Sequence, residues 1–327
     1  METLFQKIEF QGQEIDRRVI TEASYIETLD LSGPKLVLGM ENRKGYLTDS
    51  LGIREGAVLD VTLSDVERGG TWEQKIAFQI ASISPSKKAD EMILDCVDAK
   101  VWGLYKPGAN FLFSGDSVGV ILSKVMPGVK LDLDTYPLIN DYHSVNSRTV
   151  NMVRQMAKEL ASFCWYSRGV LHFKRRTTVL AQAPAFVAER DSLRPTQGGL
   201  KIIEARPIRR STLLKALAAR QYLGYDIEKG FLVGQGELGA PQVATQHPNF
   251  RTLDALGTAA APVADLALDG SGAVRPGVTA KLIWHNLYLG GRPLDESLPS
   301  QVIIGQVAHY ELKQNYFCRA TALELLA

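Results

Sequence analysis

The chain has 327 residues, of which 45% are hydrophobic, so it carries enough apolar side chains to build a buried core in about two domains. This composition excludes global disorder. Lys and Arg number 37 and Asp and Glu number 36, which gives a formal net charge of +1. The chain therefore lacks the basic excess typical of proteins that bind nucleic acid through its phosphates.

The three cysteines, Cys96, Cys164 and Cys318, lie far apart in the sequence. Their odd number and wide spacing fit neither a disulfide framework nor a metal site built on close pairs, so a reducing environment is the simpler interpretation. The first residues lack the apolar stretch of a secretory signal, and no window approaches the roughly 18 uninterrupted apolar residues of a membrane span. We expect a soluble protein that is made without export and has no membrane anchor.

Residues 1–103 are expected to form a first β-barrel domain. Over 58–63 and 76–82 apolar and polar residues alternate with period two, which predicts strands with one buried face. The joints between such segments are short and rich in glycine. Short strands, glycine-rich joints and almost no helix are typical of an antiparallel barrel or sandwich. A last strand over 91–102 closes this domain.

Residues 104–176 are expected to form an α+β domain inserted after the first barrel. A short strand over 109–113 leads into good helix-capping residues, and apolar residues at helical spacing predict a helix over 118–126. A longer helix is predicted over 147–163. It is followed by a hairpin over 164–176, with its turn at Ser167, Arg168 and Gly169. The residues expected in the core of this domain are Val153, Met156, Leu160, Trp165 and Phe173.

Residues 177–327 are expected to form a second β-barrel domain. A helix is predicted over 211–223, followed by a strand around Phe231. Residues 236–277 are poor in charge and rich in Ala, Gly and Pro, which predicts a long loop or extension without its own core. Further strands are predicted over 278–289, 300–312 and 315–325. The fold class is thus mixed β, with two antiparallel barrel domains and a helix-containing domain between them.

The segment 115–119 matches G-x-S-x-G, with Ser117 at the position of a hydrolase nucleophile. Such a nucleophile elbow needs a parallel sheet of βαβ units around it, and the residues upstream predict antiparallel hairpins. No oxyanion loop of the His-Gly-Gly type precedes it. The more economical interpretation is that Asp116 or Ser117 caps the following helix.

Cys164 and His172 lie on either side of the predicted hairpin turn and are candidates for a thiolate-imidazole pair. Cys164 stands between Phe163 and Trp165, however, and free cysteines are among the most buried residues, so an inert thiol is favoured. The histidines show no metal-binding spacing. Those histidines are His143, His172, His247, His285 and His309.

Two further groups of charged residues are candidates for binding. Asp132, Asp134 and Asp141 suggest a paired-acid site or a calcium loop, but the segment lacks the glycine and the glutamate of an EF-hand, so we expect a solvated acidic loop. The basic clusters 174–176 and 206–210 could bind phosphate or an acidic surface, although basic residues beside strands more often protect strand edges. No phosphate-binding glycine motif occurs. We predict no catalytic, metal-binding or cofactor-binding residues and no cofactor.

Three stretches of the chain together resemble the baseplate hub proteins of contractile phage tails, which include the late control D proteins and the gp27-like part of type VI secretion spikes. Residues 114–133 look like that family's unit of a capped helix, a glycine and a strand. Residues 146–176 are similar to its helix and hairpin, with a G-x-L-x-F strand at 169–173. Residues 303–325 resemble its last hairpin, with His309 and Tyr316 where a His and a Tyr often stand. The segment 143–147 departs from the family pattern, and 236–277 matches none of it.

The resemblance implies a structural, non-enzymatic hub of the tail baseplate. Two barrel domains in each of three chains would make a ring of six similar units, which adapts the tail tube to the central spike. The implied partners are two further copies of the chain, a tail tube or tube-initiator protein, the spike and other baseplate proteins, with DNA contact only through a tube lumen. The implied location is the tail baseplate of a virion assembled in the host cytoplasm.

Three alternatives remain open at this point: another tail-tube or tail-tip component, a serine hydrolase that uses Ser117, and a monomeric β module that binds carbohydrate or protein. Tyr25, Trp72 and Tyr288 are aromatic candidates for contacts with partners. Because barrels present strand edges to neighbouring copies, we expect the isolated protein to associate or to aggregate.

Overall fold

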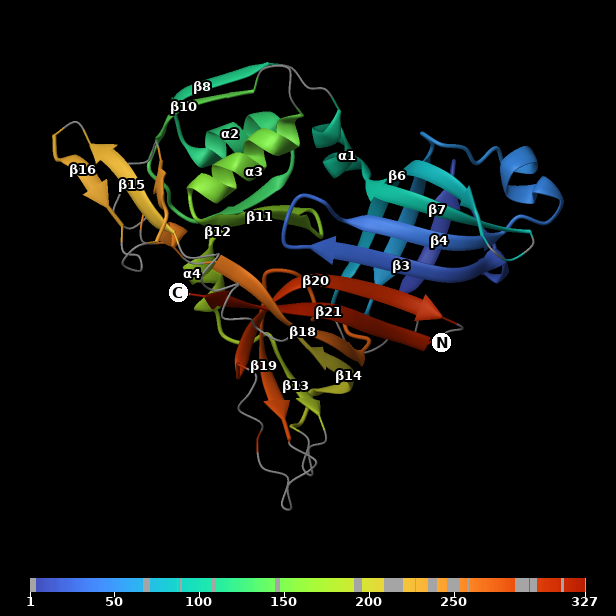
Figure 1. Ribbon diagram of the computed structural model, residues 1–327. Helices are drawn as coiled ribbons and strands as arrows, with labels where there is room; N and C mark the ends of the chain where they lie inside the picture. The colour runs from blue at the N-terminus through green and yellow to red at the C-terminus, as the bar shows by residue number, and fades with distance from the viewer. Residues whose placement is uncertain are drawn as a thin grey trace.

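A computed structural model of the chain shows its fold. The residues that the structure describes are 4–66, 71–86, 88, 90–106, 110–144, 148–190, 196–208, 220–226, 228–234, 240–245, 253, 255–257, 259–285, 294, 299–312 and 315–326. Figure 1 shows a curved sheet, a helix-containing unit, a barrel and a small projecting sheet.

The N-terminal part is a curved sheet with the strand order β3-β4-β7-β6-β5-β1-β2, in which all neighbours are antiparallel. Its alternating sequence buries one face, as in β4, where Leu36, Leu38 and Met40 are all buried. The strands are β1 Phe5–Phe10, β2 Gln13–Glu14, β3 Ile20–Thr28, β4 Lys35–Glu41, β5 Val58–Ser64, β6 Glu73–Pro85 and β7 Glu91–Asp98. Short helical turns are η1 Arg17–Val19, η2 Arg43–Gly45 and η3 Tyr46–Ser50.

The helix-containing unit has a core of its own, with Ile121, Met156 and Phe173 among its buried residues. It contains an antiparallel pair, β8 with β10, and a three-stranded sheet in the order β11-β12-β9. Its helices are α1 Ala99–Tyr105, α2 Val118–Val125, α3 Thr149–Glu159 and α4 Arg176–Leu180. Its strands are β8 Phe111–Asp116, β9 Lys130–Leu133, β10 Ile139–Ser144, β11 Ser162–Ser167 and β12 Val170–Arg175.

The C-terminal part is a closed barrel of six strands in the order β19-β13-β14-β18-β21-β20, closed by the pairing of β19 with β20. The barrel strands are β13 Phe186–Arg190, β14 Leu200–Pro207, β18 Ala259–Asp269, β19 Thr279–Trp284, β20 Gln301–Leu312 and β21 Asn315–Leu326. A small sheet in the order β16-β15-β17, here called the arm, projects from the body (Figure 1). It consists of β15 Gln221–Asp226, β16 Gly230–Val233 and β17 Gln242–Ala244.

The predicted mixed β fold class is confirmed. In the pairings of the described residues only the C-terminal sheet closes into a barrel, and within it β13 runs parallel to both of its neighbours, β14 and β19. The hydroxyl of Thr279, at the start of β19, donates to the carbonyl of Gln182 at 3.0 Å. The side-chain amide of Gln301, at the start of β20, donates to the carbonyl of Leu180 at 2.9 Å. The chain that leaves α4 therefore enters β13 at the end of the barrel where β19 also begins.

Three local predictions need correction. Residues 99–102 belong to α1 and not to a strand, because the Asp98 side chain accepts the Lys100 amide at 2.8 Å and caps a helix. Residues 162–163 belong to β11 and not to the preceding helix. The helix predicted over 211–223 is wrong from Gln221 onward, where β15 begins, and 211–219 lie outside the described residues.

The largest error concerns the loop predicted over 236–277, because residues 259–269 form the barrel strand β18. Val263, Leu266 and Leu268 of this strand are buried. The alanines between them have a low strand propensity, so the sequence pattern did not predict a strand here. The strand is stabilised instead by its pairing with β14 on one side and β21 on the other. The strands predicted at β19, β20 and β21 are confirmed for the described residues.

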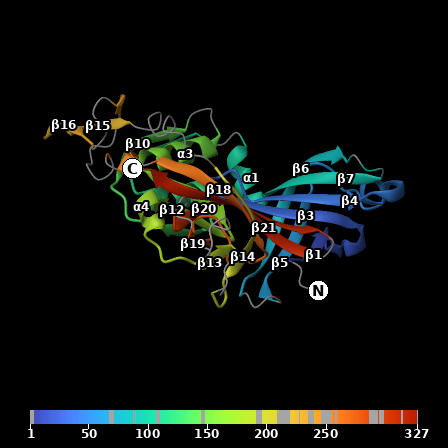
Figure 2. The ribbon, with the colours of Figure 1, turned by 60° about the horizontal axis from the view of Figure 1, so that its bottom comes forward.

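The first sheet and the barrel are joined side by side through the antiparallel pairing of β3 with β20. Figures 1 and 2 both show this seam, with β3 next to the hairpin of β20 and β21. One apolar core runs across it and includes Tyr25 of the first sheet and Val307 of the barrel. The two β units therefore present one continuous exposed surface. Among the described residues, no helix is both long and apolar enough to cross a bilayer.

Candidate functional site

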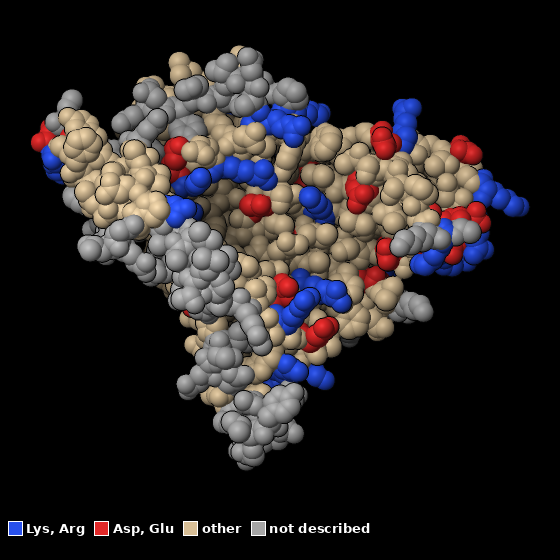
Figure 3. Space-filling view, viewed as in Figure 1, with Lys and Arg blue, Asp and Glu red and all other residues tan. Residues whose placement is uncertain are grey.

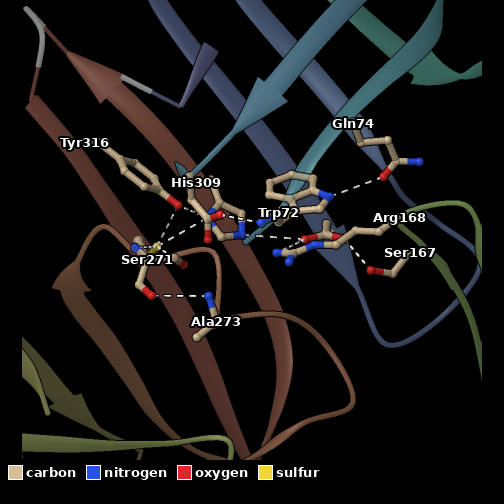
Figure 4. A network of polar contacts seen from close by, with 11 residues as sticks. Trp72, Gln74, Ser167, Arg168, Ser271, Ala273, His309 and Tyr316 are labelled. Atoms are coloured by element: carbon tan, nitrogen blue, oxygen red, sulfur yellow. Dashed lines mark hydrogen bonds and ion pairs between the residues drawn. The ribbon is translucent and has the colours of Figure 1, made fainter. Parts of the chain in front are cut away.

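A network of charged and polar side chains is buried where the first sheet, the helix-containing unit and the barrel meet (Figure 4). Glu27 comes from β3, Arg168 from the turn between β11 and β12, His309 from β20, and Tyr316 and Cys318 from β21. The backbone φ of Arg168 is 51° and that of Gly169 is 81°, so a tight hairpin turn places the arginine at its tip.

Glu27 is the centre of this network. Its carboxylate lies 3.4 Å from a guanidinium nitrogen of Arg168 and 3.5 Å from Nε2 of His309, and it accepts a hydrogen bond from the Ser167 hydroxyl. Burial alone would raise the pKa of the Glu27 carboxyl, but Arg168 and His309 outweigh burial and bring it to about 2. Glu27 is therefore ionised. Its contacts connect the first sheet with the helix-containing unit through Arg168 and with the barrel through His309.

The other side of His309 faces β21. Its Nδ1 lies 2.7 Å from the Tyr316 hydroxyl and 3.3 Å from Sγ of Cys318. Burial alone would lower the pKa of His309, but Cys318 and Glu27 raise it to about 9. Burial would raise the pKa of the Cys318 thiol, but the adjacent His309 ring lowers it. The imidazole is thus held as a cation, with the Glu27 carboxylate on one side and the Cys318 sulfur and Tyr316 hydroxyl on the other.

Cys318, His309 and Glu27 stand in the order of a nucleophile, a base and an orienting acid. Cys318 is 0% exposed, and the amide of Ser271 donates to its sulfur at 3.4 Å, so the chain covers the thiol in this conformation. The carboxylate of Glu27 also interacts with Arg168, not with the imidazole alone. The geometry favours a structural joint over a nucleophilic site.

The strand patterns of the sequence contain a signal for this network. In β20 the buried positions alternate as Val307, His309 and Glu311, and in β3 Glu27 follows Tyr25 on the buried face. Charged residues on the apolar face of an alternating strand need a buried partner. Only the resemblance drew attention to His309 and Tyr316, and no sequence spacing connects them to Glu27 and Arg168.

The outer face of the continuous sheet is a second candidate, as a contact or lumen surface. Across the seam this face carries small and charged side chains together with Ile26, Tyr310 and Leu312, and over the barrel strands it forms a shallow cleft of about 390 Å³. Its exposed or half-buried residues include Ser24, Lys35, Asp95, Glu204, Arg206, Asp265, Gln306, Ala308, Arg319 and Thr321. Figure 3 shows acidic and basic side chains interspersed over the face that it presents, without a patch of one sign.

Ser117 is the N-cap of α2, as the more economical interpretation predicted. Its side chain accepts the Val120 amide at 3.3 Å. The preceding strand β8 is paired antiparallel with β10 in a two-stranded sheet, so the parallel sheet that a nucleophile elbow requires does not surround it.

Cys164 and His172 do not form a pair. In the β11–β12 ladder Cys164 lies opposite Phe173, whereas His172 lies opposite Trp165, so the two side chains point to opposite faces. Burial raises the pKa of the Cys164 thiol, and His172 stacks on Trp165 at 4.5 Å between ring centroids. The expected inert thiol agrees with this geometry.

The acidic segment is not a solvated loop. Asp132 lies in β9, where it contacts Nδ1 of His172 at 3.0 Å and Nζ of Lys174 at 2.6 Å. Asp134 accepts the backbone amide of Arg175 at 2.8 Å. Asp141 lies in β10, and its side chain is outside the described atoms. Among the described residues, no group of three or more His, Cys, Asp or Glu side chains could hold a metal ion.

The basic cluster 174–176 is engaged within the chain. Lys174 pairs with Asp132, Arg175 lies over the ring of Tyr136 at 5.3 Å, and Arg176 lies over Phe163 at 5.9 Å. In the second cluster Arg206 lies on the exposed face of β14, and 209–210 are outside the described residues.

Two of the three aromatic candidates for partner contacts are described. Tyr25 is a core residue, buried against Phe78 and His309, and is therefore corrected from a surface candidate. Trp72 is half-buried, with Arg168 above its ring, and Tyr288 is outside the described residues. Of the residues predicted for the core of the helix-containing unit, Val153, Met156, Leu160 and Phe173 lie in that core. Trp165 is also buried, but in a separate cluster with Leu29, Val179 and Ile303.

Comparisons of the whole fold identify solved structures with this architecture. The 43 kDa tail protein of prophage MuSo2 from Shewanella oneidensis superposes with a TM-score of 0.64 at 11% identity, over 98% of this chain and 97% of that one. A tail protein from Neisseria meningitidis gives 0.61 at 12% identity, over 97% and 95% of the two chains. The chain has the fold of these tail proteins. The resemblance indicated by the sequence motifs is thus confirmed at the level of the fold.

A third structure with this fold is the c3393 protein of E. coli, a component of the type VI secretion system with structural similarity to the T4 bacteriophage tail proteins gp27 and gp5. It gives a TM-score of 0.55 at 11% identity, over 97% of this chain and 76% of that one. No family profile matches the sequence, and no curated protein matches it. The likeness therefore lies in the three-dimensional structure, at identities where sequence patterns have largely diverged.

Proposed function

We propose that this chain is a structural hub of a contractile tail baseplate, which forms a homotrimeric ring between the tail tube and the central spike. The observation that carries the proposal is the β3–β20 seam, which places the first sheet and the barrel side by side in one continuous sheet. Three such chains supply six β units. A ring of this kind would match a sixfold tube on one side and a threefold spike on the other.

The two faces of the continuous sheet support this arrangement. One face packs into the apolar core, and the other carries charged residues of both signs, small residues and a few apolar ones such as Ile26 and Leu312. Carboxylates on this face have partners within the chain: Asp265 accepts a hydrogen bond from the Thr321 hydroxyl at 2.9 Å, and Asp60 lies 3.3 Å from Nζ of Lys75. We propose that this face lines the lumen, where the lack of a basic patch would let DNA pass without tight binding.

Exposed apolar side chains supply candidate contacts on the outside of the ring. Phe231 in the arm is 80% exposed and Leu112 in β8 is 77% exposed, and both lie away from the seam between the two β units. Large exposed apolar residues mark surfaces that other chains cover. We propose that they contact neighbouring copies, the spike or other baseplate proteins, in a virion assembled in the host cytoplasm.

Light scattering coupled to size exclusion tests the proposal. The expected particle has a mass of about 108 kDa, three times the 36.0 kDa of the chain. A monomer at every concentration that remains soluble would contradict a self-assembling ring. A particle of six chains would instead favour a tail-tube component.

A variant pair sharpens this experiment. Phe231→Ser removes the largest exposed apolar side chain of the arm, and we expect it to lower the fraction of trimer if the arm reaches a neighbouring copy. Val58→Ser is the matched control, because Val58 is 42% exposed on the face proposed to line the lumen. An equal loss of trimer in both variants would argue against a specific subunit contact at the arm.

A further inference from the structure

A cleft of about 860 Å³ opens beside the buried network, where the first sheet, the helix-containing unit and the barrel come together. Its lining combines two arginines, an aromatic ring, small apolar side chains and a glycine-rich backbone segment. The residues that define it here are Trp72, Arg168, Val170, Leu200, Ser271 and Arg275. In Figure 4 the side chain of Arg168 lies along the ring of Trp72, and Ser167 lies next to it.

Arg275 is an exposed cation at this cleft, and it makes no hydrogen bond or ion pair with any residue in the described part of the chain. Partial burial lowers the pKa of its guanidinium, and repulsion from Arg168 lowers it further, more than the attraction of Glu27 offsets. The positive charge at this position is therefore not neutralised by the protein itself.

Arg168 supplies a second and independent observation. Its side chain is only 10% exposed, with the guanidinium 3.9 Å from the centre of the Trp72 ring. One terminal nitrogen reaches Glu27, but the Nε–H is buried and has no hydrogen-bond partner in the described part of the molecule. A buried N–H donor without a partner is unfavourable, and an acceptor in the cleft would relieve it.

The other charged groups at the cleft limit the charge of a ligand. Asp65 also lines the cleft, but its carboxylate accepts the Trp72 amide at 2.8 Å. His172 lies against Asp132, with 3.0 Å between Nδ1 and the carboxylate oxygen. A phosphate group, with about two negative charges at neutral pH, would be repelled by Asp65 more strongly than a singly charged carboxylate.

We propose that this cleft binds an acidic peptide segment of another protein chain, with a carboxylate held between Arg275 and Arg168. A planar carboxylate matches the donor geometry of guanidinium groups. The volume exceeds that of a lone anion, and Trp72, Val170 and Leu200 provide an apolar wall for the neighbouring side chains of a peptide. All the residues come from one chain, so the site does not depend on the proposed ring.

The test uses the full chain and a fluorescein-labelled peptide that alternates Glu and Leu, with fluorescence anisotropy as the readout. We expect saturable binding that is lost when Gln replaces every Glu in the peptide. Arg275→Gln should weaken binding about tenfold to a hundredfold, because one charge-assisted hydrogen bond is removed. Arg54→Gln is the matched control, since Arg54 is an exposed arginine that lines a different cleft, and it should leave binding unchanged.

Several results would overturn the proposal. These are no saturable binding at millimolar peptide, equal binding of the Gln peptide, or an equal effect of the Arg275 and Arg54 substitutions. Inorganic phosphate is added as a competitor. If phosphate displaces the peptide at concentrations close to the Kd of the peptide, the site binds small anions and not an acidic segment. Because Arg275 is exposed, its substitution is expected to leave the thermal unfolding midpoint unchanged, which separates lost binding from lost folding.

Discussion

Two interior regions hold this molecule together by different physical means. The first sheet buries an apolar core in which Leu38, Phe78 and Leu94 are fully enclosed. At the meeting point of the three units the interior is instead polar, with Glu27 and Arg168 in an ion pair. Apolar burial is favourable for many packings of similar volume, whereas a buried ion pair requires specific partners. The core thus supplies stability, and the polar network fixes how the units are positioned.

This difference bears on the proposed hub. A ring made of two β units per chain requires a fixed angle between those units, and the network lies at the seam that sets it. Arg168 from the hairpin of the helix-containing unit reaches across to Glu27 of the first sheet. Changes in the core should therefore alter only the stability of the chain, whereas changes in the network should alter both its stability and how its parts are arranged.

The largest expected effect comes from Phe78→Ala in the apolar core. Phe78 is 0% exposed, and its truncation leaves a cavity, so the free energy of unfolding should fall by about 3–5 kcal/mol. Chemical denaturation measures this loss. The loss should be the same at pH 5 and pH 8, because no titratable group is removed. A strong pH dependence of the loss would contradict the separation between core and network.

A somewhat smaller effect is expected from Glu27→Gln in the network, about 3 kcal/mol, because Arg168 would remain buried without its charge partner. The double variant Glu27→Gln with Arg168→Met removes both charges. Its loss should be less than the sum of the two single losses, as a double-mutant cycle of denaturation curves would show. Additive losses would mean that the two groups do not interact.

The pH dependence of stability gives the third test. The pKa of Glu27 is lowered to about 2, so its contribution is present above the ordinary pKa of about 4.5 and is lost as the pH falls from there. The pKa of His309 is raised to about 9, so its contribution is present below its ordinary pKa of about 6.5 and is lost as the pH rises from there to about 9. The stability contributed by these two groups should therefore be greatest between about pH 4.5 and about pH 6.5.

The groups that face His309 are Glu27, Cys318, Tyr316 and Tyr25. Subtracting the denaturation profile of Glu27→Gln from that of the unmodified chain isolates the acid limb, whose size is about 1.4 kcal/mol for each unit of pKa shift. A difference that stays constant between pH 2 and pH 6 would contradict the ionised, buried Glu27.

The smallest expected effect is that of Ser117→Ala, about 1 kcal/mol, because one N-cap hydrogen bond to Val120 is lost from a short helix. Thermal unfolding measures it. Assembly should be retained. Loss of an esterase or peptidase activity with assembly intact would instead support the hydrolase interpretation of the G-x-S-x-G segment.

The sequence predicts those parts of the fold whose local pattern agrees with the tertiary structure. The alternation over 58–63 predicts β5, the capping residue Ser117 predicts the start of α2, and the apolar stripe of Val153 and Met156 predicts α3. The turn at Arg168 was also predicted, although Arg168 and Gly169 were not expected to position a charged group. These are features in which neighbours in sequence determine the structure.

What could not be predicted depends on residues far apart in the chain. The strand over 259–269 is alanine-rich, and its pairing with β14 and β21 decides its structure. The network joins Glu27 with Arg168 and His309, and no local spacing connects such distant positions. The wall of the cleft at Arg275 likewise assembles from several separate segments. Long-range pairing and burial of charge supply this information.

The central claim is that the two β units of each chain stand side by side in a ring of three chains. Electron microscopy of the purified assembly tests it most directly. The account predicts class averages with threefold symmetry and six similar lobes around a lumen, which the Glu27→Gln variant would blur by loosening the seam. Single asymmetric particles, or rings with one lobe per chain, would contradict it.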